Sequence, residues 1–185
     1  MRKKELRLEY KNVRDTMSSG ERKEKDIIIL EQLCKMREYA EAETVFTYVN
    51  FGSEVNTIGI IKNVLAQGKR VAVPRVMKNG KIPLMKFIWI ENFETLRPNN
   101  IGICEPVSGE VAVHNYNTVF IVPGLVFSET MDRIGYGGGF YDAYLSGIKA
   151  VKIGLCYEVQ MKSGLIGEGF DVKMDYIVTD KRIYF

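Results

Sequence analysis

The stretch Thr118–Val122 reads TVFIV, and Pro123 and Gly124 follow it directly. Such a short, almost wholly apolar run is typical of a strand that is covered on both faces, as strands of parallel sheets are. Two other runs are similarly rich in β-branched and aromatic residues, at positions 44–49 (TVFTYV) and 150–156 (AVKIGLC). Together the three runs predict a largely parallel sheet.

Segments with helical character alternate with these strands. We expect residues 58–67 to form a helix that Thr57 caps and Gly68 ends. The other expected elements are strands at 70–74, 82–90, 176–179 and 182–185, and a helix at 140–146. Residues 92–113 are rich in Pro, Gly and Asn and are expected to form a long connection. This alternation predicts an α/β protein, a three-layer α/β/α fold in a single domain of residues 1–185.

The N-terminal region predicts two helices. Apolar residues recur at spacings of four and three within residues 3–17, which is the period of an amphipathic helix: Leu6, Tyr10, Val13 and Met17. Ser18 with Glu21 fits a capping box for a second helix that ends near residue 37. We expect the two helices to form an N-terminal helical hairpin.

The composition indicates one globular domain. The chain has 185 residues, 46% of them hydrophobic, and a net charge of +3, which is too small to indicate nucleic-acid binding. Its apolar runs are too short to cross a membrane, and the N-terminus has no apolar signal segment. The three cysteines form no CxxC pair, which favours a reducing compartment. We therefore expect a cytoplasmic monomer without nucleic-acid or membrane partners.

The candidate site is residues 133–142 (RIGYGGGFYD), called the glycine segment below. Its glycines let a ligand approach the backbone, and a helix is expected to start directly after them. Arg133 offers a planar guanidinium to phosphate oxygens, and Asp142 is a candidate ligand for Mg²⁺. The segment fits neither of the two common phosphate-binding glycine patterns. Its chemistry alone therefore leaves two readings open, a phosphate site and a plain flexible turn.

The string R-I-G-Y-G-G-G-F-Y-D-x-Y-L resembles the nucleotide signature of the 5-formyltetrahydrofolate cyclo-ligase family. Other stretches resemble family segments in the same order: residues 3–7 (KKELR), 53–57 (SEVNT), 102–106 (GICEP) and 171–175 (DVKMD). The likeness covers nearly the whole chain. It implies an enzyme that uses ATP to cyclise 5-formyltetrahydrofolate to 5,10-methenyltetrahydrofolate, with release of ADP and phosphate through an iminium phosphate intermediate.

The resemblance also implies particular site residues. ATP would be bound by the N-terminal helix and the glycine segment, through Lys3, Lys4, Arg7, Arg133, Ile134, Gly135, Tyr136, Gly137, Gly138, Gly139, Phe140 and Tyr141. Val49, Glu54 and Tyr136 would contact the folate, with the Glu54 carboxylate accepting the paired N–H donors of the pterin.

Catalysis would fall to Arg133 and Tyr136, and the cofactor would be Mg²⁺ held by Asp142 and Asp175. For Val49 a buried strand position explains the residue equally well. Trp89, the only tryptophan, fits either a core position or a pocket wall.

Two positions depart from the family pattern. Met131 stands where the family usually has Gly, so we expect the turn before Arg133 to be made differently. Gly138 stands where some members have Lys, which leaves the phosphate charge to other groups. Two alternative functions stay open, a sugar-phosphate isomerase or CoA-transferase-like enzyme, and a non-catalytic nucleotide- or folate-binding module.

Overall fold

The structure is a computed structural model that describes residues 2–79, 82–165 and 167–185. The strands of its main sheet are β1 (Thr44–Thr47), β2 (Arg70–Asn79), β3 (Ile82–Ile90), β6 (Thr118–Val122), β9 (Val151–Leu155), β10 (Tyr176–Val178) and β11 (Ile183–Tyr184). The helices are α1 (Lys3–Asp15), α2 (Ser19–Lys35), α3 (Arg37–Glu41), α4 (Ile58–Ala66) and α5 (Phe140–Leu145). The shorter elements are β4 (Arg97–Pro98), β5 (Cys104–Glu105), β7 (Val126–Phe127) and β8 (Arg133–Ile134), and the 3₁₀ turns η1 (Phe93–Thr95) and η2 (Glu158–Gln160).

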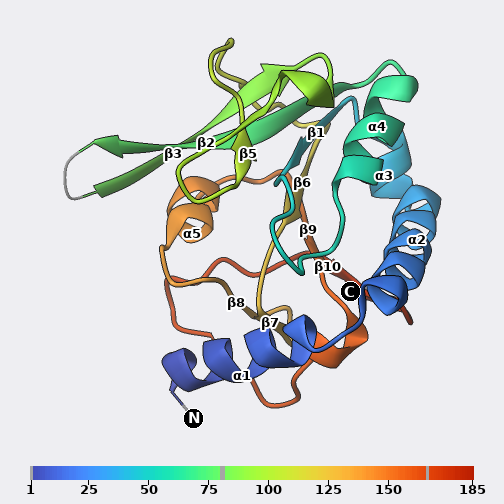
Figure 1. The fold of residues 1–185 in the computed structure, drawn as a ribbon, viewed down its shortest axis with the longest axis vertical. Helices are drawn as coiled ribbons and strands as arrows, with labels where there is room; N and C mark the ends of the chain where they lie inside the picture. Colours follow the sequence, from blue (N-terminus) through green and yellow to red (C-terminus); the bar gives the residue numbers. More distant parts are fainter. Residues whose placement is uncertain (1, 80–81, 166) are drawn as a thin grey trace.

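The main sheet forms the middle layer of the fold (Figure 1). Its strand order is β11-β10-β9-β6-β1-β2-β3. All pairs from β10 to β2 are parallel, whereas β3 and β11 pair antiparallel at the two edges. The prediction of an α/β fold with a largely parallel sheet is confirmed.

Both faces of the central strands are buried. Along β6, Val119 and Ile121 face a core shared with α2, α3 and α4, while Phe120 and Val122 face a core shared with α5. Because successive side chains of a strand point to opposite faces, a strand covered on both sides must be apolar throughout. The three-layer arrangement predicted from TVFIV is therefore confirmed.

Strand β2 is longer than predicted, because it runs on to form a hairpin with β3. Its pairing with β1 ends at Ala72, so beyond that point one side of β2 has no strand beside it among the described residues. Pro74 lies in this stretch, where its missing N–H removes no ladder bond on the open side. Residues 80–81, between the two strands, lie outside the described residues.

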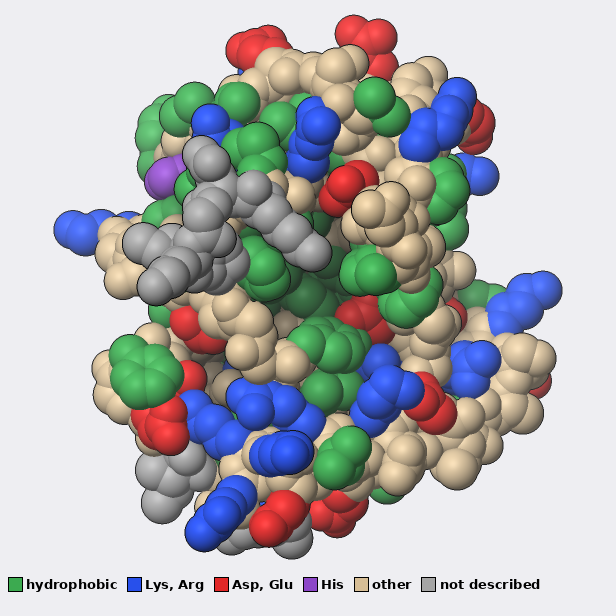
Figure 2. Space-filling model, turned by 60° about the vertical axis from the view of Figure 1, so that its left-hand side comes forward, with side chains coloured by type: hydrophobic (Ala, Val, Ile, Leu, Met, Phe, Trp, Pro, Cys, Tyr) green, Lys and Arg blue, Asp and Glu red, His purple; other side chains and the backbone are tan. Residues whose placement is uncertain are grey.

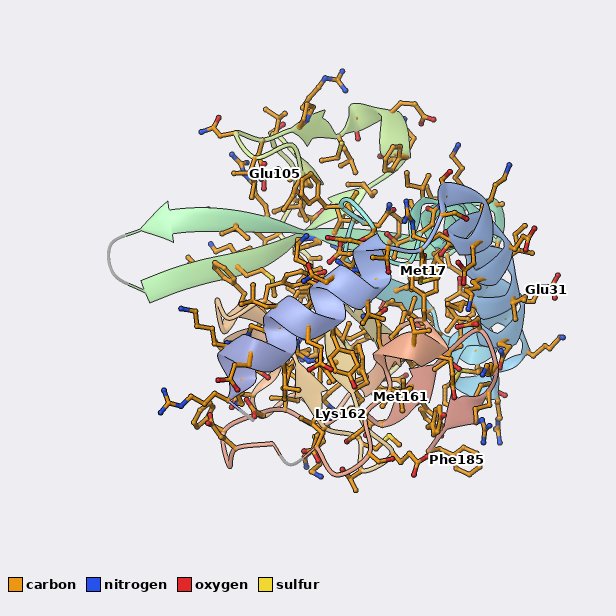
Figure 3. All side chains as sticks on the ribbon, turned by 60° about the horizontal axis from the view of Figure 1, so that its bottom comes forward. Met17, Glu31, Glu105, Met161, Lys162 and Phe185 are labelled. Carbon is orange, nitrogen blue, oxygen red and sulfur yellow. The ribbon has the colours of Figure 1, made fainter. Side chains whose placement is uncertain are left out.

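The two N-terminal helices exist but do not pack as the predicted hairpin. Helix α1 contacts β7 and η2, whereas α2 contacts α3 and β10. Figure 3 shows α1 lying across the molecule, with Met17 just beyond its end. The buried face of α1 is also shifted from the prediction, since Val13 is 36% exposed and Arg14 only 3%. Ser18 Oγ does cap α2, accepting from Glu21 N (3.1 Å).

Helix α4 ends as predicted, with Gly68 in the left-handed region at φ +71°. The predicted cap at its start is different. Thr57 Oγ1 accepts a hydrogen bond from Asn50 N (3.0 Å), and it makes no capping bond within the helix. Thr57 thereby closes the loop that follows β1, which carries Glu54.

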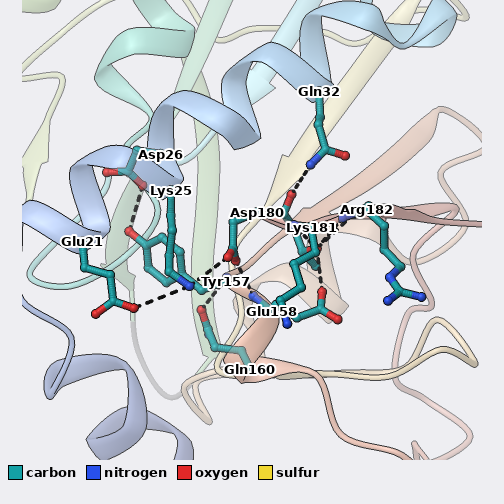
Figure 4. A network of polar contacts seen from close by, with 11 residues as sticks. Glu21, Lys25, Asp26, Gln32, Tyr157, Glu158, Gln160, Asp180, Lys181 and Arg182 are labelled. Atoms are coloured by element: carbon teal, nitrogen blue, oxygen red, sulfur yellow. Dashed lines mark hydrogen bonds and ion pairs between the residues drawn. The ribbon is translucent and has the colours of Figure 1, made fainter.

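A polar network attaches α2 to the far end of the sheet (Figure 4). Lys25 forms an ion pair with Asp180 (2.8 Å), and Tyr157 donates to Asp26 (2.8 Å). Gln160, on η2, donates to the carbonyls of Gly124 (3.1 Å) and Leu125 (3.0 Å). The network therefore also fixes the backbone that follows β6. Within the described ranges, no helix is long and apolar enough to cross a bilayer.

Replacing Ile121 tests the two-sided core. Ile121→Ala should lower the free energy of unfolding by about 2–5 kcal/mol, because it leaves a cavity in a fully buried strand. Denaturant unfolding measures this directly. Ile101→Ala is the matched control at a position 68% exposed, and it should change stability by less than about 0.5 kcal/mol. Equal effects would contradict the assignment of β6 as the centre of the fold.

Candidate active site

The glycine segment lies beyond the carboxyl end of β6. Two short antiparallel strands, β7 and β8, return the chain toward the end of β6, with Phe127 paired to Arg133 and Val126 to Ile134. Helix α5 follows immediately. Ligands of open parallel sheets bind beyond the carboxyl ends of the strands, so the segment occupies the position where a site is expected.

Arg133 is the first residue of the glycine segment, and its side chain, only 4% exposed, lies beneath the glycines. Its Nη2 donates to Asp142 Oδ1 (2.8 Å), and its Nη1 donates to the Pro123 carbonyl (3.2 Å). Gly135 packs directly on it, since an added Cβ would lie 2.7 Å from Nη1. Arg133 therefore supports the segment from below, whereas the sequence predicted a guanidinium open to phosphate.

The glycines shape the upper surface of the segment. Gly137 and Gly139 have φ of +100° and +67°, values that other residues rarely adopt. An added Cβ at Gly138 would come within 2.7 Å of the Phe140 ring. A lysine at position 138, as in some family members, would therefore require Phe140 to move.

Helix α1 packs over the glycine segment. Arg7 Nε donates to the Gly135 carbonyl (2.8 Å), and the Arg7 guanidinium carbon lies 3.4 Å from where a Cβ of Gly137 would be. Lys3 Nζ pairs with Glu168 (2.9 Å) and Asp171 (2.7 Å). Lys4 is exposed. Of the three predicted N-terminal cations, Arg7 thus contacts the glycine segment, whereas Lys3 is paired with the two carboxylates.

The space-filling view shows a hollow on this side of the molecule (Figure 2). Hydrophobic side chains line its floor, and Lys and Arg side chains gather below it, on the side where α1 lies in Figure 1. A hollow with an apolar floor and a cationic rim suits a ligand that has an aromatic part and an anionic part.

Tyr136 and Glu54 meet across this site. Tyr136 is 48% exposed, and its hydroxyl donates to Glu54 Oε1. Phe51 N donates to the other carboxylate oxygen of Glu54 (2.8 Å). Burial raises the pKa of Glu54, while these two hydrogen bonds and the nearby Arg14 act to lower it. Burial and the Glu54 carboxylate also raise the pKa of Tyr136.

Arg14 joins this pair and was missed by the sequence reasoning. Its Nη1 donates to the Tyr136 hydroxyl (2.8 Å), and its Nε donates to Ser53 Oγ (3.0 Å). The signal was available, because residue 14 stands seven positions after Arg7 and hence on the same face of α1. A basic residue at that spacing extends the cationic face that Lys3 and Arg7 begin.

Several predicted contact residues are instead part of the protein interior. Ile134 packs with Leu6 and Leu125, and Val49 lies in the core beneath α2 and α4. Phe140 is half-buried against the other core. Val49 is buried as the alternative explanation expected, but it lies two residues beyond the end of β1 and not in the strand predicted for residues 44–49.

Tyr141 is also half-buried, with Arg133 Cζ 5.9 Å from its ring centroid. Among the described residues, neither the Tyr141 hydroxyl nor Arg133 Nε has a hydrogen-bond partner, although both atoms are buried. Buried polar atoms are rarely left unpaired in proteins. A bound ligand or water that reaches this point would satisfy them.

The two predicted metal ligands have different partners. Asp142 Oδ1 accepts from Arg133 and from Val172 N (3.1 Å). Asp175 accepts from the backbone N–H (2.7 Å) and the ammonium group (3.4 Å) of Lys152, at the start of β9. Within the described residues, no group of three or more His, Cys, Asp or Glu could hold a metal ion. The chain thus offers single carboxylates, which suits Mg²⁺ carried largely by phosphate oxygens.

Met131 makes the turn that the family usually assigns to glycine. Its φ is +65°, the only non-glycine residue with positive φ in the part of the chain that the structure describes. The expectation of a different turn is therefore wrong, because Met131 adopts the glycine-like conformation itself. That conformation costs a residue with a Cβ about 1 kcal/mol or more.

Trp89, the only tryptophan, and His114, the only histidine, lie away from this site. The guanidinium carbon of Arg70 lies 3.8 Å from the centroid of the Trp89 ring. Trp89 also lines a groove of about 660 Å³. His114 lines a second groove of about 430 Å³. Both grooves lie where parallel strands begin, at the edge opposite the glycine segment, so we place the active site by its side-chain chemistry rather than by groove size.

Comparison with known proteins identifies the family. The model of the 5-formyltetrahydrofolate cyclo-ligase family matches residues 1–180. The chain belongs to this family of enzymes. Cyclo-ligases are ATP-dependent ligases of folate one-carbon metabolism, and the resemblance stated from the glycine segment is confirmed.

Individual cyclo-ligases agree over most of their length. The chain is 24% identical to 5-formyltetrahydrofolate cyclo-ligase of Mus musculus, covering 95% of this chain and 92% of that protein. It is 28% identical to the probable enzyme of Schizosaccharomyces pombe, covering 85% and 84%. The solved 5,10-methenyltetrahydrofolate synthetase of Aquifex aeolicus is 28% identical, with a TM-score of 0.85 over 100% of this chain and 92% of that chain.

Gly135→Ala tests whether the glycine segment rests on Arg133. The added Cβ would meet the guanidinium at 2.7 Å, so stability should fall by about 1–3 kcal/mol. Thermal or denaturant unfolding measures the loss. Gly169→Ala is the control, because a Cβ there meets nothing within 4 Å. If both variants unfold like the parent protein, the close packing of Gly135 on Arg133 is refuted.

Proposed function

We propose that this chain catalyses the ATP-dependent cyclisation of 5-formyltetrahydrofolate to 5,10-methenyltetrahydrofolate, releasing ADP and phosphate. The observation that carries the proposal is the pair formed by Glu54 and Tyr136, which joins a carboxylate to the glycine segment under the cationic helix α1. The family match over residues 1–180 supports the same reaction.

Glu54 is suited to hold the pterin. One oxygen accepts from Tyr136 and the other from Phe51 N, which fixes the plane of the carboxylate. Each carboxylate oxygen has a second lone pair, so both can still accept from the paired N–H groups of a pterin edge. Because only the ionised carboxylate accepts at both oxygens, substrate binding should weaken as the pH falls through the raised pKa of Glu54.

The other wall of the proposed folate site is the ring of Phe51, which is contacted by Gly102 from the connection before β6. Gly102, with φ +88°, approaches the Phe51 ring so closely that an added Cβ would lie 3.2 Å from it. Phe51 is half-exposed beside Glu54. An aromatic ring at this position can stack on a flat ligand ring.

The ATP phosphates would lie between the glycine segment and α1. Lys3, Lys4 and Arg7 supply positive charge there, and the glycines let phosphate oxygens approach backbone N–H groups. In the structure the Lys3 ammonium pairs with the carboxylates of Glu168 and Asp171. A phosphate group would take the place of these carboxylates as the anionic partner of Lys3. We expect ATP to exchange for these partners.

Asp142 and Asp175 would hold the Mg²⁺, which would supply positive charge to offset that of the transferred phosphoryl group. Asp142 is the better placed carboxylate, since Arg133 occupies only its Oδ1 and the residue lies in the first turn of α5, beside the glycines. Asp175 remains a proposed ligand that would first have to leave Lys152.

The reaction needs positioning more than a protein nucleophile. The formyl oxygen on N5 attacks the γ-phosphorus of ATP, ADP leaves, and an iminium phosphate forms. N10 then attacks the formyl carbon and loses its proton to solvent, and phosphate departs with the electron pair of the C–O bond as the ring closes. Arg133 would act by holding Asp142 and the segment in place, and the Tyr136 hydroxyl would orient the folate through Glu54.

The two alternative functions stand differently. The family match argues against a sugar-phosphate isomerase or CoA-transferase-like enzyme. The product-formation assay described below distinguishes the enzyme from a non-catalytic binding module. We further propose that the protein acts as a monomer in the cytoplasm, which light scattering and fractionation would test.

Product formation is the direct test of the proposed function. The purified chain, 5-formyltetrahydrofolate, Mg²⁺ and ATP should produce the absorbance of the methenyl product, with one ADP released per product molecule. Omitting ATP should abolish the signal. A folded protein that binds both substrates but forms no product would support the non-catalytic module instead.

Arg133→Ala tests the support beneath the segment. We expect kcat/KM for ATP to fall at least about tenfold, which is about 1.4 kcal/mol of transition-state stabilisation. Because the variant leaves Asp142 without its partner, stability is measured in parallel. Arg37→Ala, at an exposed ion pair on α3, is the control and should retain parental kinetics. Parental kinetics for Arg133→Ala would remove Arg133 from the site.

A further inference from the structure

Arg14 is unusual among the cations of α1. It is only 3% exposed, and the hydrogen bonds of its guanidinium go to hydroxyl groups, those of Tyr136 (2.8 Å) and Ser53 (3.0 Å). Arginine is rarely buried so fully without a specific task. Ser53 in turn donates to Asp15, the last residue of α1.

The two contacts of Arg14 fix the direction of the neighbouring hydrogen bonds. A guanidinium can only donate, so the oxygens of Tyr136 and Ser53 must accept from it. Each hydroxyl has one proton, which is then free to be donated elsewhere. The Tyr136 proton goes to Glu54 Oε1, and the Ser53 proton goes to Asp15.

We infer that Arg14 is a positioning residue of the folate site, which holds the Tyr136 hydroxyl as a donor to Glu54 and supplies positive charge beside that carboxylate. The inference rests on the proposed function, because it assigns Arg14 to the pterin side of the site rather than to the phosphates. Lys3 and Arg7, on the same helix, contact Asp171 and Gly135 instead.

The surroundings of Glu54 determine what loss of Arg14 does. The titratable groups that act on it are Arg14 from α1, Tyr136 from the glycine segment, Tyr48 at the end of β1 and Tyr141 from α5. Of these, Arg14 alone carries a charge at neutral pH, since burial raises the pKa of all three tyrosines. Removing Arg14 takes away a group that lowers the pKa of Glu54, so that pKa should rise further.

The experiment measures the Glu54 carboxyl directly by ¹³C NMR titration of the full-length protein, with Glu54→Gln used to assign the signal. Arg14→Met should raise the pKa of Glu54 by about one unit, the effect expected of losing a nearby opposite charge. Arg14→Lys keeps the positive charge but loses the planar group that donates to both Tyr136 and Ser53, so it should raise the pKa of Glu54 by less. Arg37→Met, the same change at an exposed site, should give none.

Kinetics form a second arm with a pattern that mere destabilisation would not produce. In Arg14→Met, KM for 5-formyltetrahydrofolate should rise at least about tenfold while KM for ATP stays within about twofold. The acid limb of kcat/KM for the folate should move to higher pH. Equal increases in both KM values, or an unmoved acid limb, would overturn the assignment.

The two arms separate this inference from the function on which it rests. If the parental protein forms no methenyl product, the proposed function fails, while the NMR titration still decides whether Arg14 acts on Glu54. Should Arg14→Met not fold, Arg14→Lys and Tyr136→Phe replace it, and each must raise the pKa of Glu54. An unchanged Glu54 titration in a folded Arg14 variant refutes the inference.

Discussion

The ion pair between the buried Arg133 and the half-buried Asp142 is the constraint on which the site depends. Arg133 joins the end of β6, through the Pro123 carbonyl, to the first turn of α5, through Asp142. Gly135 lies directly on the guanidinium, so the course of the glycine segment follows from where that group is held. Loss of Asp142 would leave the buried Arg133 guanidinium without its opposite charge, so the position of Arg133 depends on this partner.

Helix α1 completes the site from the opposite end of the sequence. It reaches the glycine segment through Arg7 and Arg14, and Leu6 packs with Ile134 below them. The carboxylate of Glu54 comes from a third region, the loop after β1 that Thr57 closes. The proposed folate and phosphate contacts therefore depend on three distant segments that only the folded sheet brings together.

Much of the fold could be predicted because its signals are local. A strand buried on both faces must be apolar throughout, and TVFIV meets that requirement without tertiary information. The extension of β2 could not be predicted in the same way. Pro74 normally ends a strand, and it is tolerated here only because β1 pairs no further than Ala72.

Part of the clustering of the predicted site residues could be expected from sequence, but their contacts could not. Sequence placed Arg133, Tyr136 and Glu54 in one site, yet nothing local shows that Arg133 lies beneath the glycines. The apolar period of α1 suggested Val13 as buried, whereas the helix turns Arg14 inward because Tyr136 and Ser53 accept its hydrogen bonds. Partners far apart in sequence decide which face of a helix is buried.

Amide hydrogen exchange with a non-hydrolysable ATP analogue tests the central claim, that ATP binds between the glycine segment and α1. The account predicts that Mg²⁺ and the analogue slow exchange at residues 135–139 and in the first turns of α1. Residues 107–110, which line the groove at the opposite edge of the sheet, should exchange at an unchanged rate. Protection at residues 107–110 with none at 135–139 would contradict the account.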